Sequence, residues 1–381
     1  MKFIHTSDWH IGRQLHNESL LDEQAHMLEQ IVALAAEHQV DALVVAGDIY
    51  DRSIPPASAV ALLDKFLNIL LNEHQIPVLM IAGNHDGQER LGFAARQMAA
   101  SGLYISGPLQ AQVKPLILKG RDGDACFYPI PYAEPAQVRH VLEVVDASSH
   151  QQAMACLLEQ VQAHDSQGLP KVVVAHCFLD GGSESESERP LSIGGADKID
   201  PALFCGFDYA ALGHLHGPQY KGAEHVRYSG SPLKYSFSEH KQKKSVTLVE
   251  LSAGDTPKIT LLALKPRRDV RVIEGLLDEL LQQGEKDPGR EDYLMVRLLD
   301  TQALLDPMGK LRGVYPNVLH LERTGLMSRQ QGQEIGRDRI KKGELDMFSD
   351  FFSQVQGEAM TEAQQQTMSR LIEELHREQE Q

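Results

Sequence analysis

Long apolar runs are missing from this 381-residue sequence. No stretch of about 18 consecutive apolar residues occurs, so we expect no membrane-spanning helix. The opening segment Met1–Asp8 turns polar too soon for a secretory signal peptide. Cysteine is also scarce, and the four cysteines form no CxxC pair, which favours reduced packing residues over disulfides or a zinc site: Cys126, Cys156, Cys177 and Cys205. These absences together predict a cytoplasmic protein.

Positive charge is in deficit as well. Lys and Arg number 37 against 53 Asp and Glu, so the net charge is −16. This balance excludes a protein that binds nucleic acid by bulk charge alone, but it leaves local chemistry on nucleic acid open. The deficit is concentrated near the end of the chain, because residues 344–381 carry nine acidic residues and two arginines. No GxxxxGK[ST] segment occurs, so the chain is not expected to bind ATP in a P-loop.

The first half of the chain alternates short β-branched runs with amphipathic stretches. This rhythm predicts an α/β fold with a largely buried sheet and helices on its faces. Helices are expected at 22–38, 56–74 and 149–164. Strands are expected at 2–7, 41–47, 77–83, 112–119, 125–130, 171–175, 208–212, 226–229, 244–251 and 257–264.

Composition shifts divide the rest of the chain. Pro266, Arg267 and Arg268 mark a boundary, so we expect a first domain over 1–265 and a small α+β unit over 266–325. A basic linker over 326–343 and a helical tail over 344–381 follow. The α+β unit is expected to contain strands at 269–272, 292–299 and 317–322 and helices at 274–283 and 303–313. The tail contains two helix candidates separated by Gly357.

Polar side chains that can bind metals follow five of the buried strands. In chain order they are Asp8, His10, Asp48, Asn84, His85, His176, His214 and His216. Asp8 and His10 lie two residues apart, a spacing that in an extended segment points both side chains the same way. Ligand sites of open α/β sheets lie outside the carboxyl ends of the strands. Packing alone does not explain five strands that all deliver nitrogen and oxygen ligands to this edge.

The ligand chemistry predicts two adjacent divalent cations. Imidazole, carboxylate and amide ligands suit Mn, Fe or Zn rather than a thiolate site. Asp48 is the lone carboxylate of its strand and suits a bridging position. Two cations about 3.5–4 Å apart clamp the attacking and leaving oxygens of a displacement at phosphorus. His85 is either an acid or charge stabiliser for the leaving oxygen, or an outer-sphere structural histidine.

The motifs DxH, GDxxD, GNHD, a lone His and GHxH together resemble the calcineurin-like metallophosphoesterases. More closely, they resemble the SbcD family, the nuclease subunits of bacterial SbcCD complexes. The segments that carry this resemblance are His5–Gly12, Gly47–Asp51, Gly83–Asp86, Ala211–His216 and Tyr228–Pro232. The resemblance implies a β-sandwich flanked by helices, with a small α+β capping domain and a C-terminal helical tail.

The resemblance also implies a role for each candidate. One metal would be held by Asp8, His10, Asp48 and His216, and the other by Asp48, Asn84, His176 and His214. His85 would be catalytic without being a primary ligand. The metals in this family are manganese. The implied reaction is hydrolysis of DNA phosphodiesters, as a 3′-to-5′ exonuclease on duplex ends and an endonuclease on hairpins and single strands, in DNA repair, recombination and replication.

The family resemblance further implies partners. The tail would dock on the coiled coil of an SbcC-like ATPase, and the α+β unit would help hold DNA over the site. Helices at 56–74 and 87–100 would form a homodimer within a heterotetramer. The apolar residues of the first helix supply either that interface or an intramolecular face: Leu62, Leu63, Phe66, Leu67 and Leu70.

Several alternatives remain open. Asp51, where some relatives carry His, either orients a neighbouring histidine or caps the turn. Trp9 is expected to point into packing, and the loop 183–188 is expected to be a solvated surface loop, placed so that it could shape the cleft after His176. The basic stretch 323–342 is either a phosphate contact or a solvated linker. The alternative functions are another metallophosphoesterase, acting on a phosphoprotein or a small phosphodiester, and a scaffold with an inactive metal site.

Overall fold

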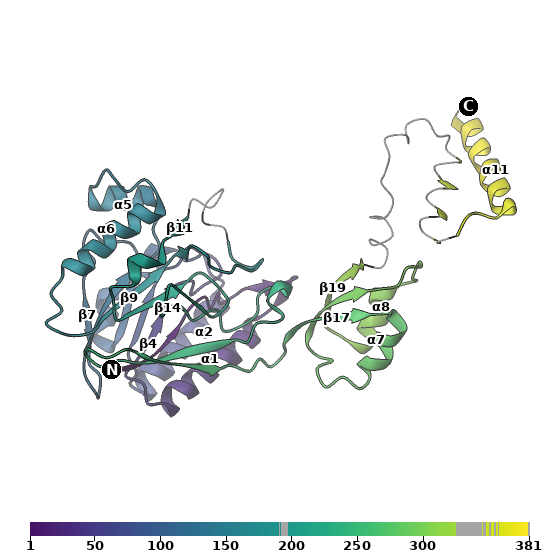
Figure 1. Ribbon diagram of the computed structural model, residues 1–381. Coiled ribbons are helices and arrows are strands. Elements are labelled where there is room, and N and C mark those ends of the chain that lie inside the picture. The colour runs from purple at the N-terminus through teal and green to yellow at the C-terminus, as the bar shows by residue number, and fades with distance from the viewer. Residues whose placement is uncertain are drawn as a thin grey trace. The chain divides into compact units, whose positions relative to one another are not determined.

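The chain forms two compact units, Met1–Arg267 and Arg268–Gln381 (Figure 1). The structure is a computed structural model that describes residues 1–189, 191, 197–324 and 358–379, with single positions at 345, 348, 349, 352, 353 and 356. Among these residues no helix has both the length and the apolar character needed to cross a membrane.

The first unit contains two six-stranded sheets. In the first sheet, four neighbouring strands run parallel: β1 (Lys2–Thr6), β4 (Ala42–Val45), β5 (Val78–Ile81) and β6 (Leu103–Ser106). Two antiparallel strands, β15 (Ser245–Glu250) and β16 (Lys258–Ala263), extend it beyond β1. Parallel order brings the carboxyl ends of β1, β4 and β5 to one edge.

The second sheet repeats this plan. Its four central strands are parallel: β8 (Ala125–Ile130), β9 (Lys171–His176), β12 (Tyr209–Gly213) and β14 (Ala223–Tyr228). The antiparallel strands β7 (Leu116–Leu118) and β13 (Gln219–Lys221) close its two sides. His176 ends β9 and lies opposite Gly213 of β12, so the segments that follow both strands start at the same edge.

The core between the sheets is apolar and aromatic. Phe3 of the first sheet contacts two rings of the second, Phe127 at 5.3 Å and Tyr209 at 5.7 Å between ring centroids. His5 adds a polar link, because its Nδ1 lies 3.0 Å from the Tyr209 hydroxyl. Burial lowers the pKa of His5 to about 3, so this imidazole is neutral. Two packed sheets with helices outside them confirm the predicted sandwich.

Helices cover the outer faces of the sandwich (Figure 1). They are α1 (Leu21–Glu37), α2 (Ala57–Asn68), α5 (Pro135–Leu142) and α6 (His150–Ala163). In α2 and the π-helical turn Ile69–Glu73 that extends it, Leu63, Phe66 and Leu70 are buried within this chain. Trp9 packs edge-on against Phe66 at 5.0 Å between ring centroids, as expected for a packing residue. The intramolecular alternative therefore holds for these three apolar residues.

The predicted continuous helix at 87–100 is wrong. The chain instead forms two single turns, α3 (Gln88–Leu91) and α4 (Ala95–Met98), followed by a 3-10 turn. Ala94 lies between them in the left-handed region at φ 57°, which ends the first turn and redirects the chain. The strand β6 and the helix α5 were not expected at all, since both are short segments with weak apolar periods.

The second unit contains a parallel three-stranded sheet, β17 (Val270–Gly275), β18 (Tyr293–Leu298) and β19 (Val318–Arg323). The crossovers are α7 (Leu277–Gly284) and α8 (Pro307–Val314), which bury Leu280 and Leu311 against Leu294 and Val296. Both helices begin later than expected, α7 because β17 continues to Gly275. The tail helix α11 spans Glu362–Gln379, and the linker 326–343 lies outside the described residues.

Candidate metal centre

The loops that follow β1 and β4 continue the pairing of their strands. Asp8 N donates to Gly47 O at 3.0 Å, His10 N to Asp48 O at 3.0 Å and Ile11 N to Ile49 O at 2.9 Å. The loop with Asp8 and His10 therefore lies directly along the loop with Asp48. Backbone pairing, rather than side-chain packing, brings these two sets of polar residues together.

Four of the candidate ligands have unusual backbone conformations. Asp8, His10, Asp48 and His214 have φ values of 54°, 44°, 51° and 112°. The prediction that Asp8 and His10 share an extended segment is therefore wrong, because β1 ends at Thr6. Such conformations cost about 1–3 kcal/mol each in non-glycine residues and cluster at functional sites. The fold tolerates this strain where it turns the side chains inward.

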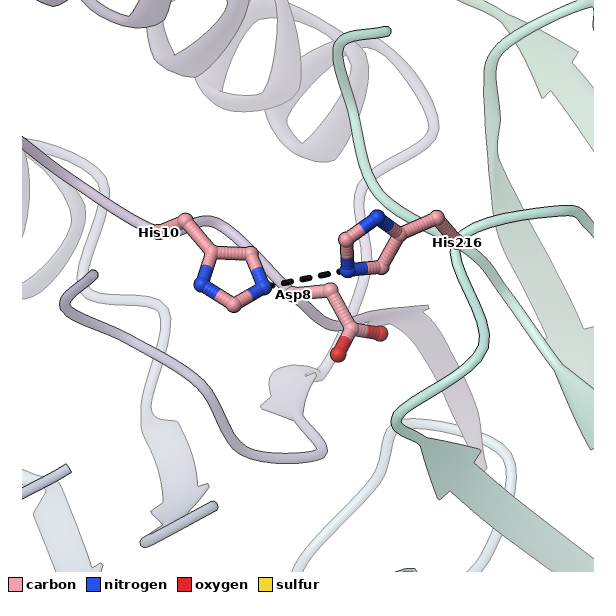
Figure 2. Close-up of side chains that lie close together, drawn as sticks. All are labelled: Asp8, His10 and His216. Carbon is pink, nitrogen blue, oxygen red and sulfur yellow. Dashed lines mark hydrogen bonds between the residues drawn. The ribbon is translucent and has the colours of Figure 1, made fainter. Parts of the chain in front are cut away.

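Asp8, His10 and His216 form the first cluster (Figure 2). All three are buried, and one ligand atom from each lies within 4.8 Å of the others. The two imidazoles face each other, with His10 Nε2 3.1 Å from His216 Nε2. Three ligand atoms that lie this close together, contributed by loops 206 residues apart in the sequence, fit a single shared cation.

Asp48 lies between two histidines. Its Oδ2 is 3.6 Å from His10 Nε2 and 3.5 Å from His176 Nε2. Asp8, Asp48 and His176 also bring one ligand atom each within 4.8 Å, so the second cluster shares Asp8 with the first. The same Nε2 atom of His176 lies 2.9 Å from Asn84 Oδ1. The Asp48 carboxylate thus lies within 3.6 Å of an imidazole nitrogen of both His10 and His176.

His85 lies beside the first cluster, with its ring centroid 4.7 Å from that of His10. Its backbone N–H donates to Asp48 Oδ1 at 2.9 Å, and its Nδ1 lies 2.9 Å from the Asp51 carbonyl oxygen. Since a carbonyl only accepts, Nδ1 of His85 carries a proton. Asp51 thus orients His85 through its backbone, while its carboxylate lies 3.8 Å from His10 Nδ1, beyond hydrogen-bond reach.

His214 joins the centre differently from the other candidates. Its backbone N–H donates to Asp8 Oδ1 at 3.0 Å, and its ring lies 5.5 Å from the His176 ring between centroids. Among the described residues it belongs to none of the three-residue clusters with closely spaced ligand atoms. The structure therefore brings all eight candidates to one edge and leaves His214 at its margin.

The charges at this edge are unbalanced. Burial and the neighbouring Asp48 raise the pKa of Asp8 well above its usual value. Burial lowers the pKa of His10, His176 and His214, so these imidazoles are neutral and each keeps a lone pair. In the described part of the chain His10 Nδ1 is buried without a hydrogen-bond partner. Buried carboxylates beside neutral imidazoles and an amide oxygen fit divalent cations.

Two glycines allow the sheets and loops to approach this closely. A Cβ on Gly213 would lie 1.9 Å from Ala46 O, and one on Gly83 would lie 2.2 Å from Asp48 Oδ1. The lack of a side chain is therefore what matters at both glycines. A larger residue at Gly213 would push the second sheet away from the end of β4, and a larger residue at Gly83 would push the loop after β5 away from Asp48.

Asp86 is a structural part of the site to which sequence reasoning gave no role. Its carboxylate accepts hydrogen bonds from three backbone N–H groups, those of Ile49 at 3.1 Å, Tyr50 at 2.9 Å and Gly83 at 2.9 Å. It thereby ties the loop after β4 to the loop after β5. Burial and the charge of Asp48 raise the pKa of Asp86 to about 7. The sequence feature that could have identified Asp86 is its place in the motif GNHD.

The loop 183–188 also belongs to the centre, contrary to the expectation of a solvated loop. Ser187 is buried, and its Oγ lies 2.6 Å from His216 Nδ1. Glu188 Oε1 accepts the backbone N–H of His216 at 2.8 Å. Only the exposed members of the loop, such as Ser183 and Glu184, agree with the prediction. A polar segment without an apolar period does not reveal that some of its hydroxyls turn inward.

Comparison with known proteins assigns the family. Residues 1–218 match the model of the calcineurin-like phosphoesterase family. The chain is 35% identical over 377 residues to the SbcD protein of the nuclease SbcCD from Staphylococcus saprophyticus subsp. saprophyticus, covering 98% of both chains. The chain belongs to the SbcD family of calcineurin-like phosphoesterases. A second SbcD protein, named in the same way and from Staphylococcus epidermidis, is 32% identical over 373 residues, again 98% of both chains.

The second unit has its own match. Residues 266–356 match the family described as type 5 capsule protein repressor C-terminal domain. Among solved structures, TT1561 of Thermus thermophilus is 15% identical, covers 68% of this chain and 98% of its own, and has a TM-score of 0.38. That value is too low to add to the assignment. The SbcD family is thus shown by matches over nearly the whole chain.

Proposed function

We propose that this chain is a metal-dependent DNA phosphodiesterase, the nuclease subunit of an SbcCD-type complex. The observation that carries the proposal is the convergence of Asp8, His10, Asp48, His176 and His216 in buried clusters where the carboxyl ends of strands from both sheets meet. The two curated relatives are named as nucleases. The proposed activities are 3′-to-5′ exonuclease on duplex ends and endonuclease on hairpin and single-stranded DNA, in repair, recombination and replication.

The proposed cofactors are two divalent cations, most suitably Mn²⁺. Asp8, His10, Asp48 and His216 would hold one of them, and Asp48, Asn84, His176 and His214 the other. When bound, two such cations lower the pKa of water and offset the charge of the reacting phosphate. The chain contributes the rigid shape of the site, since backbone bonds such as Asp8 N to Gly47 O hold the ligand loops in place.

His85 is proposed as the catalytic residue. Its Nδ1–H is engaged by the Asp51 carbonyl, so Nε2 is the ring atom left to face a substrate. From that atom the imidazole can give a proton to the leaving oxygen or stabilise its charge. His85 is only partly buried, unlike the ligand histidines, and this exposure suits a residue that must meet DNA.

The proposed partners are DNA and an SbcC-like ATPase with a coiled coil. The domain roles follow the family: 1–265 as the nuclease domain, 266–325 as the capping domain, 326–343 as the basic linker and 344–381 as the tail that docks on the ATPase. A homodimer within a heterotetramer is the proposed assembly. Because the chain carries a net charge of −16, its affinity for DNA should come from the metals, a local basic stretch and the partner.

A nuclease assay tests this proposal. The purified full-length chain is incubated with Mn²⁺ and either duplex ends or hairpin DNA, alone and after co-purification with the ATPase, with and without ATP. We expect Mn²⁺-dependent cleavage. A chain that takes up no divalent metal and cleaves no DNA would refute the proposal. Faster turnover of bis-p-nitrophenyl phosphate than of hairpin DNA would instead support the small-phosphodiester alternative, and a metal-loaded chain that never cleaves would support the scaffold alternative.

A further inference from the structure

His216 uses both of its ring nitrogens. Nε2 faces His10 in the metal centre, and the second nitrogen, Nδ1, lies on the far side of the ring (Figure 2). Nδ1 lies 2.6 Å from Ser187 Oγ, and the same Oγ lies 2.5 Å from Glu239 Oε1. The hydroxyl of Ser187 therefore stands between an imidazole and a carboxylate, both of them buried.

The carboxylate of Glu239 is surrounded by donors. Lys244 Nζ donates to its Oε2 at 2.6 Å, and Tyr235 N donates to its Oε1 at 3.1 Å. Lys244 is itself buried and also donates to the His216 carbonyl oxygen at 2.8 Å and to Ser231 Oγ at 2.8 Å. Within this arrangement Glu239 acts only as an acceptor, because each of its neighbours presents an N–H or O–H group.

The proton count then decides the state of His216. Ser187 has a single hydroxyl proton, and the acceptor Glu239 takes it. The short contact from Ser187 Oγ to His216 Nδ1 is a hydrogen bond only if Nδ1 carries the proton and donates it to Oγ. A neutral imidazole has one N–H, so Nε2 must then keep its lone pair. That lone pair points toward His10 and Asp8.

We propose that Ser187, Glu239 and Lys244 are positioning residues that hold the proton of His216 on Nδ1 and direct its Nε2 lone pair into the metal centre. The inference rests on the proposed function for the metal, but the tautomer itself is a property of the metal-free chain. Glu188 assists by accepting a hydrogen bond from the backbone N–H of His216, and this bond holds the loop 183–188 against His216. Partners of this kind fix both the tautomer and the ring orientation of ligand histidines.

Nitrogen-15 NMR of the metal-free, full-length chain tests the tautomer directly. The His216 signals are assigned by their loss in His216→Asn. We expect the Nδ1–H form in the wild-type chain. Glu239→Gln should reverse it, because the Gln side chain turns its oxygen to Lys244 and its N–H to Ser187, whose hydroxyl must then donate to Nδ1. A wild-type His216 protonated on Nε2 would overturn the proposal, whether or not the chain binds metal.

Metal affinity supplies the second readout. In isothermal titration with Mn²⁺ alone, Ser187→Ala should bind about 10–100-fold more weakly than the wild type. In EDTA, the melting temperature of Ser187→Ala should match that of the control variant Ser183→Ala. Ser183 is an exposed serine of the same loop, and its hydrogen bonds use only backbone atoms. Equal Mn²⁺ affinity of Ser187→Ala and Ser183→Ala would overturn the proposal. If no chain binds Mn²⁺, the proposed function fails and the NMR result still decides the tautomer.

Discussion

His10 and His216 face each other with their Nε2 atoms 3.1 Å apart, although they lie 206 residues apart in the sequence. Only one proton fits between two imidazole nitrogens at this distance, and the carboxylate of Asp8 faces the same space. In the absence of a proton between them, the two lone pairs and the carboxylate repel one another. A divalent cation converts this repulsion into three attractive contacts.

Removal of divalent metal should therefore destabilise the first unit. At a free concentration of 100 times its dissociation constant, a ligand that binds only the folded state adds about 2.7 kcal/mol to the free energy of unfolding. We expect the melting temperature to fall in EDTA and to recover when Mn²⁺ is added in excess, as measured by calorimetry. An unchanged melting temperature after complete chelation would contradict a metal centre among these buried side chains.

Substitutions of Asp48 and of His85 should affect metal binding and catalysis differently. Asp48→Ala removes the carboxylate between His10 and His176, so the purified variant should lose both bound metal and activity. His85→Gln should keep its metal and lose about 10²–10⁴-fold in rate, the usual share of a general acid. Metal content and Mn²⁺-dependent DNA cleavage are measured on the same samples. Loss of metal from His85→Gln would place His85 among the ligands instead.

The location of the candidate site could be predicted because it follows from strand order. Parallel strands end at one edge of their sheet, so the polar residues after β1, β4 and β5 had to lie together, as did those after β9 and β12; packing of the two sheets against each other then joins the two sets. The apolar runs that mark these strands are strong local signals. Periods of the same kind marked the elements of the α+β unit, whereas the sandwich of two sheets was implied by the family resemblance and by no period in the sequence.

What could not be predicted depends on contacts between distant segments. The left-handed backbone at Asp8 and Asp48 is imposed by pairing between two loops, which leaves no trace in residue spacing. The inward turn of Ser187 depends on Glu239, 52 residues away. The break at Ala94 is equally hidden, because alanine is the best helix former and only tertiary context places it at φ 57°.

Asp86 should be needed for the stability of the site although it lies outside the ligand set. In Asp86→Asn an amide N–H replaces one carboxylate oxygen and opposes a backbone donor such as that of Tyr50. One buried donor left unpaired costs about 1–3 kcal/mol, so the melting temperature and the Mn²⁺ affinity should both fall. Asp122→Asn, at an exposed aspartate, is the matched control. Equal behaviour of the two variants would show that the three backbone bonds are dispensable.

Asp41, at the other end of the first sheet, should stabilise the fold in a pH-dependent way. Burial alone would raise the pKa of Asp41, but hydrogen bonds from Lys2 N at 2.7 Å and from Arg121 Nε at 3.0 Å, together with the charge of Arg121, lower it below its usual value. A carboxyl group whose pKa is lowered in the folded state binds its proton less readily there than in the unfolded chain. Its contribution is therefore fully present above the unfolded pKa of about 3.9 and is lost as the pH falls through the folded value.

The test compares melting temperatures of the wild type and Asp41→Asn from pH 7 down to pH 3. Asp41→Asn should be less stable by about 1–2 kcal/mol near neutral pH, because the amide pairs poorly with two sets of N–H donors. The difference should shrink below about pH 4, where the Asp41 carboxyl group of the unfolded wild-type chain begins to take up its proton while that of the folded chain does not. Asp122→Asn should show no such convergence. A difference between Asp41→Asn and the wild type that stays constant down to pH 3 would mean that Asp41 acts through shape alone and not through its charge.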